Sequence, residues 1–391
     1  MKSKLNYNNI FNHLSNLNLV VMAGLRVRSG TDFFHSLLDG HPEIVQTTGS
    51  CLYNYYSFWN ATIYKDDLDS LIEEFIYDPD HIGLFDSRFN MKEKWGKLGI
   101  DKNEYFEVDK QLFKSYVNNL MCDSKITSRN FFLAINGAYS MCIGIDILKT
   151  KFLFFHAHTV ENIDLIMNDF PLSEVLLMIR ELREGALSFI ENKSLSDPSY
   201  YMPSSCVNPF KEYSMINNFN SKYDIKYISL KDLHHNPDIV LKNFCHNLNI
   251  EYKKDVLLRS DYHGKLWWGD VLSKKDLQGF NASFGEVNKW KSQFSYVDNM
   301  IIEFLFKEEY QILNYETAIS KLEYKIMYIL FPLLVIFPMR YELKILKYNI
   351  IKKKGLRRII TSPIFYLIRI KMYLKVYFLK LSSNKATINK F

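Results

Sequence analysis

Apolar runs and helical stripes alternate along most of the chain in the order that is typical of an α/β protein. A buried strand is predicted over residues 17–24, and the helix that follows it, over 31–39, has apolar positions on one face. Three further strands are predicted over 151–158, 174–180 and 225–230, each followed by a helical stretch. Strands that alternate with helices predict βαβ units, and therefore a mainly parallel sheet flanked by helices.

The stretch over residues 50–150 interrupts this alternation. It is rich in aromatic residues, and its pattern indicates helical pieces joined by long loops. We interpret it as a mostly helical insertion that shapes the site of a second substrate.

The last part of the chain, residues 321–391, differs from the rest in charge. It holds 16 lysines and arginines and only two acids, Glu323 and Glu342, a charge of +14, whereas residues 1–320 carry −8. The net charge of +6 is therefore no reason to expect nucleic acid as a partner. The uncharged run at 326–339 contains two prolines and is shorter than the roughly 20 apolar residues that span a bilayer.

Apolar, aromatic and basic residues interleave through this basic amphipathic tail. Such a pattern predicts a helix that lies at an anionic membrane surface. The alternative is a tail that packs on its own domain or on a second subunit. The first 19 residues are polar and rich in asparagine, without the apolar run of a signal peptide. The five scattered cysteines suggest reduced thiols, so we expect a cytoplasmic protein, held peripherally at the inner face of a bacterial membrane.

The loop between the first strand and the first helix, Gly24 to Thr31, reads GLRVRSGT. Backbone N–H groups in such a loop and the positive end of the helix dipole together form an anion site. Arg28 would add a fixed positive charge, and the hydroxyls of Ser29 and Thr31 would add donors around Gly30. In the ordinary GxxxxGK[ST] loop the cation follows the glycine, so this loop is not of the usual Mg-ATP kind. A glycine-rich turn with surface arginines is the alternative interpretation.

A second phosphate motif begins at the end of the strand predicted over 174–180. Arg180 ends this strand, and Ser188 follows eight residues later on the next helix. The carboxyl ends of strands form the usual ligand edge of an open α/β sheet, and a planar guanidinium suits bidentate contact with a phosphate. Taken alone, Arg180 fits a salt bridge at a strand end equally well.

Together the two motifs resemble those of sulfotransferases that use PAPS (3'-phosphoadenosine 5'-phosphosulfate). The family's 5'-phosphosulfate loop reads roughly [RK]-[ST]-G-T-T, and it is matched here by Arg28, Ser29, Gly30 and Thr31. Asp32 stands in place of the second threonine. Phe33 falls where the cytosolic enzymes have a tryptophan that stacks on adenine, although a plain core aromatic fits there equally well.

The family's 3'-phosphate motif follows a strand and reads R-[DN]-P-R-D-x-x-x-S. It is matched in register by Arg180, Arg183 and Ser188, while Glu181 and Leu182 replace the usual Asp-Pro. The resemblance covers about residues 17–315 and is specific at the two phosphate motifs.

The resemblance also implies a general base. In the cytosolic enzymes this base is a histidine that lies just after a strand, 22 residues before the 3'-phosphate arginine, and His158 has that spacing. A histidine near neutral pKa suits the task. His156 stands where those enzymes have a lysine that helps the leaving group. The alternative bases are His35, His41 and Glu43.

Two later segments extend the resemblance. Residues 225–250 resemble the family's later strand–helix unit, with Lys231 in place of a glutamate. Residues 264–291 occupy the place of its C-terminal loop over the nucleotide, which implies donor contacts from Trp290 and Lys291.

The resemblance implies a P-loop-type α/β domain over residues 1–320, with 50–150 as the acceptor-side insertion and 321–391 as the tail. The implied activity is sulfuryl transfer from PAPS, without a metal, to a hydroxyl or amine of a glycan or a lipid-linked acceptor. Two alternatives stay open: a P-loop kinase or other nucleotide phosphotransferase, and a non-catalytic binder of a nucleotide or glycan. The missing Gly-Lys pair and the absence of a strand ending in aspartate count against the phosphotransferase.

Overall fold

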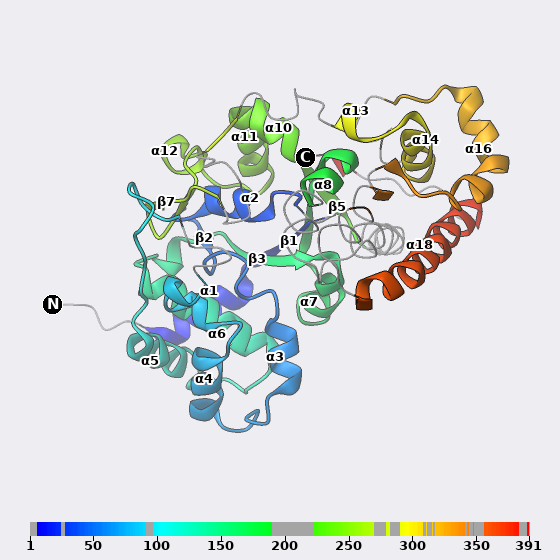
Figure 1. Cartoon of the computed structure of the whole chain (residues 1–391). Helices are drawn as coiled ribbons and strands as arrows, with labels where there is room; N and C mark the ends of the chain where they lie inside the picture. Colours follow the sequence, from blue (N-terminus) through cyan, green and yellow to red (C-terminus); the bar gives the residue numbers. More distant parts are fainter. Residues whose placement is uncertain are drawn as a thin grey trace.

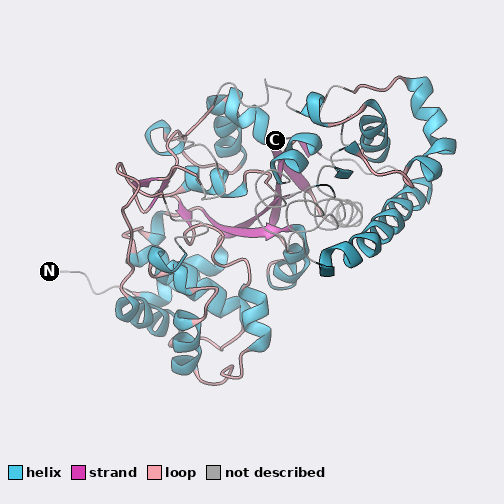
Figure 2. Ribbon diagram, in the orientation of Figure 1, coloured by secondary structure: helices cyan, strands magenta, loops and turns pink. Residues whose placement is uncertain are grey.

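The fold is built on one parallel sheet with helices on both faces (Figures 1 and 2). The computed structural model describes residues 6–24, 28–90, 97–189, 223–269, 279–281, 290–307, 310, 315, 317–340, 342–343, 347, 356–382 and 389–390.

The strands of this sheet lie in the order β2-β3-β1-β4-β5-β8, and every neighbouring pair is parallel. Their bounds are β1 (Asn18–Gly24), β2 (Ile44–Val45), β3 (Phe152–Thr159), β4 (Glu174–Ile179), β5 (Ile225–Ser229) and β8 (Asn389–Lys390). The four strands predicted from apolar runs are confirmed to within one residue at each end, and so is the parallel α/β fold class. The two strands of this sheet that the pattern missed, β2 and β8, are only two residues long.

Each face of the sheet is covered, because successive side chains of a strand point to opposite sides. On β1, Val20 and Met22 pack with Phe34 of α2 and Phe244 of α11. The residue between them, Val21, packs on the other side, in the larger core formed with α1 and the insertion. The helices around the sheet are α1 (Tyr7–Asn16), α2 (Thr31–Leu38), α7 (Ile163–Asp169), α8 (Leu182–Phe189), α10 (Leu230–His235), α11 (Pro237–Asn247) and α12 (Lys254–Leu257).

The insertion between β2 and β3 consists of helical pieces, as the sequence predicted. These are α3 (Tyr55–Ala61), α4 (Leu68–Tyr77), α5 (Lys110–Met121) and α6 (Ser128–Cys142), with the short 3₁₀ helices η1 (Ile82–Leu84), η2 (Ser87–Asn90) and η4 (Ile147–Lys149). Many of the aromatic residues of this region are buried in its interior. Phe132 of α6 joins it to the sheet, with its ring centroid 5.2 Å from that of Phe155 on β3.

A second cluster of helices follows the short hairpin of β6 (Asp261–Tyr262) and β7 (Lys265–Leu266). It comprises α13 (Trp290–Gln293), α14 (Tyr296–Leu305), α16 (Lys321–Leu334) and α18 (Leu356–Ser382). Apolar residues on one side of α16 and of α18 pack with α8 and α14 in a separate core. The tail therefore packs on its own chain, at least through this side. Among the described residues, no helix combines the length and the apolar character needed to cross a bilayer.

Candidate active site

The loop after β1 has the backbone that an anion-binding turn requires. Within the described residues Arg28 to Gly30, both Arg28 (φ +68°) and Gly30 (φ +88°) adopt the left-handed conformation, and α2 begins at Thr31. A Cβ atom on residue 30 would lie 2.5 Å from Cδ1 of Leu230. Glycine is therefore required here both by its φ angle and by the close approach of α10. The turn directs the open N-terminus of α2 toward the carboxyl edge of the sheet.

Arg180 lies directly after β4 and reaches this loop. Its Nη1 donates to the carbonyl oxygen of Arg28 at 3.2 Å, across 152 residues of sequence. The adjacency follows from the sheet, because β1 and β4 are neighbours and Gly24 pairs with Met178 near their carboxyl ends. The two predicted phosphate motifs are therefore brought together at one point.

Burial makes the charge of Arg180 costly. Loss of hydration is the largest influence and lowers the pKa of Arg180 to about 10, with Glu184 acting in the opposite direction and the positive charge of Arg28 lowering the pKa further. The arginine still carries its proton at neutral pH. Two neighbouring cations with little water between them would be stabilised by a bound anion.

Arg183 and Trp290 have a different environment from Arg180. The guanidinium of Arg183 is buried, 3.5 Å from the ring centroid of Trp290, and it donates to Glu181 (2.6 Å) and Glu303 (2.9 Å). Trp290 is itself only 6% exposed. The ring that was predicted to contact the donor thus packs on the second arginine of the motif, and its contact with the donor stays a prediction.

Two further residues that were predicted to contact the donor, Ser188 and Lys291, lie near the surface. Ser188 is half-buried in the last turn of α8, the helix that begins just after Arg180. Lys291 is exposed, with its Nζ 5.6 Å from the ring centroid of Trp290. Both stay predictions.

Phe33 belongs to a small aromatic group beside the loop. Its ring stacks on His234 of α10 (centroids 4.8 Å apart, interplanar angle 13°) and meets the edge of Phe280 at 5.5 Å. Burial lowers the pKa of His234 to about 4, and the charge of Arg180 adds to this effect. The imidazole is therefore neutral at physiological pH, so the three rings form an uncharged aromatic group near Arg180.

His158 lies at the carboxyl end of β3, next to the strand that leads into the loop. An irregularity in the pairing with β1 places it opposite Ala23, and it has a left-handed backbone (φ +64°). Its side chain is exposed, and its ring centroid lies 5.6 Å from that of Tyr53, which belongs to the start of the insertion. A base at this position faces both the predicted donor loop and the predicted acceptor side.

Asp32 and His156 complete a cluster with His158. One potential metal-ligating atom from each residue lies within 4.8 Å of the other two, and Oδ1 of Asp32 also accepts from the hydroxyl of Ser50 at 3.1 Å. Nδ1 of His156 lies 3.1 Å from Nδ1 of His35. Two imidazoles and a carboxylate can transfer and stabilise a proton, and they are also residue types that bind a divalent cation.

Asp32 was not predicted to join these histidines, because it precedes them by more than a hundred residues. The departure from the family motif at Asp32, where a threonine is usual, was the available signal.

The other candidate bases lie elsewhere. Glu43 directly precedes Ile44, which pairs with the first residue of β3, so His41 and Glu43 belong to the amino edge of the sheet. There, Nε2 of His41 lies 3.0 Å from the carbonyl oxygen of Glu251, and Glu43 forms an ion pair with Lys151 (2.7 Å). His35 lies inward of the site, buried against His156. Of the candidates, His158 alone combines exposure with a position at the loop.

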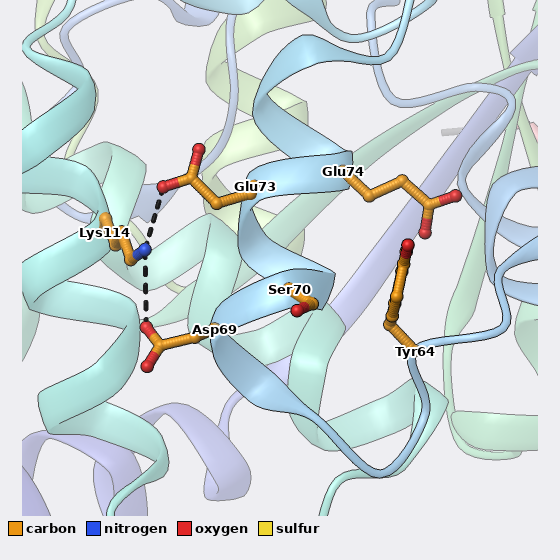
Figure 3. Close-up of a pocket in the computed structure, with 6 residues that line it drawn as sticks. All are labelled: Tyr64, Asp69, Ser70, Glu73, Glu74 and Lys114. Carbon is orange, nitrogen blue, oxygen red and sulfur yellow. Dashed lines mark hydrogen bonds and ion pairs between the residues drawn. The ribbon is translucent and has the colours of Figure 1, made fainter.

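A pocket on the surface of the insertion has no connection to this site (Figure 3). It is lined by polar residues of α4 and α5 and by Tyr64. Its cation, Lys114, already pairs with Glu73 at 2.8 Å and Asp69 at 3.4 Å. The pocket therefore offers no net positive charge to an anionic donor.

Comparison with known proteins found distant structural matches and no match in sequence. No family model matches the sequence, and no curated protein matches it. One of the solved structures that match is a sulfotransferase domain from the curacin biosynthetic pathway. It is 14% identical, with 70% of this chain and 87% of that chain covered, and the TM-score is 0.39. A likeness this distant does not establish an activity, so function has to be argued from the site.

Proposed function

We propose that this protein is a sulfotransferase that moves a sulfuryl group from PAPS to a hydroxyl or amine of an acceptor. The observation that supports it most is the hydrogen bond from Arg180 to the carbonyl of Arg28. It joins two motifs that each suit a phosphate, and PAPS carries phosphate groups at both its 3' and 5' positions. A ligand with one phosphate cluster would need only one of the two motifs.

In this proposal the donor lies along the carboxyl edge of the sheet. Arg28 and the amides of the Ser29–Thr31 turn bind the 5'-phosphosulfate, and the turn also receives the helix dipole of α2. Arg180 and Ser188 bind the 3'-phosphate. Phe33, with the neutral ring of His234 beside it, is placed to contact the adenine. Trp290 and Lys291 are kept as outer contacts of the donor, with Trp290 also packed on Arg183.

The residues at the end of β3 would carry out the proton transfer. As the acceptor oxygen attacks sulfur, the bond from sulfur to the bridging phosphate oxygen breaks, and His158 takes the acceptor's proton. Asp32 is close enough to His158 to stabilise the imidazolium that results. Arg28 offsets the negative charge that grows on the leaving phosphate.

The acceptor would approach from the side of the insertion. Ser50 and Tyr53, at its start, contact Asp32 and His158 respectively, so the insertion reaches the reacting groups. An aromatic face beside a general base suits a hydroxylated acceptor, and we propose a glycan or a lipid-linked glycan. The predicted cytoplasmic position at a membrane belongs to the same proposal.

Calorimetric titration with PAP, the desulfated product, tests the donor site. We expect PAP to bind the purified protein more tightly than ATP with magnesium does. Arg180→Ala should weaken PAP binding by about ten- to a hundredfold, the value of one or two charge-assisted hydrogen bonds. Arg180→Lys should recover part of this loss, because it restores the charge but not the planar fork. The control is Arg88→Ala, which removes an exposed arginine on the insertion, away from the loop.

A preference for Mg-ATP, or PAP binding that Arg180→Ala leaves unchanged, would contradict the proposal and favour a phosphotransferase. The chemical step is tested separately with His158→Ala, which should bind PAP normally and lose transfer from PAPS. Transfer that is lost after treatment with a chelator and restored by zinc would show instead that the Asp32, His156 and His158 cluster binds a metal.

A further inference from the structure

The side of α16 that faces away from the protein core carries large apolar residues. Leu322, Ile326, Ile329 and Leu333 recur at intervals of three and four residues, which places them on one side of the helix. Ile329 is 77% exposed and Leu333 is 60% exposed. The other side of the helix is packed in the core with α14 and α18, so the exposed residues are held in fixed positions.

The long helix α18 repeats this arrangement. Its exposed apolar residues include Ile364, Leu367, Phe378 and Leu381, and they follow the same helical spacing. Between Leu367 and Phe378, Lys371 and Lys375 are exposed, as is Ile368. Figure 1 shows α16 and α18 along one side of the molecule, at the end opposite α4 and α5. We call the exposed sides of α16 and α18 the tail face.

A cleft continues this apolar surface where α16 ends. It has a volume of about 390 Å³ and lies between the start of α14 and the turn after α16. Its lining includes Val297, Leu334, Phe337 and Leu343, with Arg340 exposed among them.

The two acids of the tail do not offset the lysines on this face. Glu342 is buried, where it accepts from Nε of Arg369 at 2.9 Å. Glu323 caps the N-terminus of α16 and accepts from the hydroxyl of Tyr296. Since residues 321–391 contain no other acid, the tail face is apolar with a positive charge.

We propose that the tail face docks on the surface of an anionic lipid bilayer. The apolar side chains of α16 and α18 would enter the headgroup region, and Lys371, Lys375 and Arg340 would contact lipid phosphates. In this arrangement the two helices would lie along the bilayer surface. A second copy of the chain fits this face less well. Pairing of two such faces would bring lysines together without carboxylates to neutralise them.

Sedimentation with lipid vesicles tests the charge requirement. The full-length protein should pellet with phosphatidylcholine–phosphatidylglycerol vesicles, remain in solution with pure phosphatidylcholine vesicles, and be released by high salt. Lys371→Glu combined with Lys375→Glu should weaken binding by at least about tenfold, because each lysine near such a surface is worth about fivefold. The matched control is Lys125→Glu with Lys149→Glu, the same charge change at exposed positions of the insertion, with binding unchanged.

The apolar part of the face has its own pair of variants. Ile329→Ser with Leu333→Ser should weaken vesicle binding severalfold without lowering thermal stability, because both side chains are exposed. The control is Ile63→Ser with Leu172→Ser, which removes two apolar residues outside the tail that are more exposed than Ile329 and Leu333 (82% and 90% exposed).

Two outcomes would overturn the proposal. One is an absence of binding to anionic vesicles by the full-length protein. The other is a protein that self-associates in sedimentation equilibrium, dissociates in the Ile329 and Leu333 variant, and gains nothing from vesicles, which would make the face a contact between copies of this chain. Neither result depends on PAP binding, so the donor site and the tail face can fail separately.

Discussion

The carboxyl edge of the sheet and the tail face both present positive charge, but they do so in opposite ways. At the sheet edge, the side chain of Arg180 is 17% exposed and is held by the carbonyl of Arg28 and by Glu184. On the tail face, Lys371 and Lys375 are exposed in a row between apolar side chains. Buried, oriented donors suit one anion of fixed shape, whereas exposed lysines suit a surface whose charges are spread and mobile. Positive charge at the sheet edge therefore suits the recognition of one ligand, whereas positive charge on the tail face suits attachment to an extended anionic surface.

The largest expected effect separates two arginines of the same motif. Arg183→Ala should destabilise the fold by about 3–5 kcal/mol, because it leaves the buried carboxylates of Glu181 and Glu303 without their cation. Arg180→Ala should leave stability nearly unchanged, since it removes a poorly hydrated charge at the edge of the site. Urea unfolding of the two variants measures the difference. Equal losses would show that Arg180 is a structural residue as well, and that this edge is not prepared for a ligand.

A smaller effect is expected from the turn that precedes α2. Gly30→Ala adds a Cβ that would lie 2.5 Å from Leu230, so the loop or α10 has to shift. We expect PAP binding to weaken by about tenfold or more, the result of roughly 1–3 kcal/mol of strain. Gly144→Ala is the matched control: its φ of +86° is almost the same, but no atom lies within 4 Å of the added Cβ. If both variants lose PAP binding equally, the loss comes from a general destabilisation of the protein and not from the close approach of Leu230 to the loop.

The strands and the edge at which they end could be predicted from the sequence, whereas the position of Arg183 could not. The strands were predictable because a strand buried on both faces needs an apolar run, which β1 and β4 have over nearly their full length and β3 has from Phe152 to Phe155. The meeting of Arg28 and Arg180 followed from the same pattern, since parallel neighbouring strands end at one edge. The interior position of Arg183 could not be predicted in this way. It depends on Glu303 and Trp290, more than a hundred residues away, and no local pattern connects them.

The cluster of Asp32 with the histidines was missed for a related reason. His156 and His158 could be placed on a strand, and Asp32 on the first turn of a helix. Their distance depends on how α2 crosses the sheet and on the irregular pairing after Met22. Tertiary packing sets both, whereas spacing along the chain sets neither.

The smallest expected effect concerns negative charge, at a half-buried acid that follows α2. Asp39 follows the helix and accepts from the backbone N–H of Gly264 at 3.2 Å. Burial raises the pKa of Asp39 to about 7, against the opposing influence of this hydrogen bond, and the neighbouring charge of Asp261 raises it further. Like Arg180, this group is poorly hydrated, but here no ligand is expected to compensate its charge.

The consequence is a pH-dependent cost of folding. In the unfolded chain Asp39 loses its proton near its ordinary pKa of 3.8, whereas the folded protein retains it up to about 7. Between these values the folded state binds more protons, so its stability falls as pH rises from about 4 to about 7 and then levels off.

Asp39→Asn keeps an acceptor for Gly264 and removes the charge. It should stabilise the protein by about 1–2 kcal/mol at pH 8 and by much less at pH 5. Urea unfolding at both pH values checks this, with the exposed Asp146→Asn as the control for a lost surface charge. A gain that is the same at both pH values would mean that Asp39 is already ionised at pH 5. The folded protein would then hold the charged carboxylate without the cost that its surroundings are expected to impose.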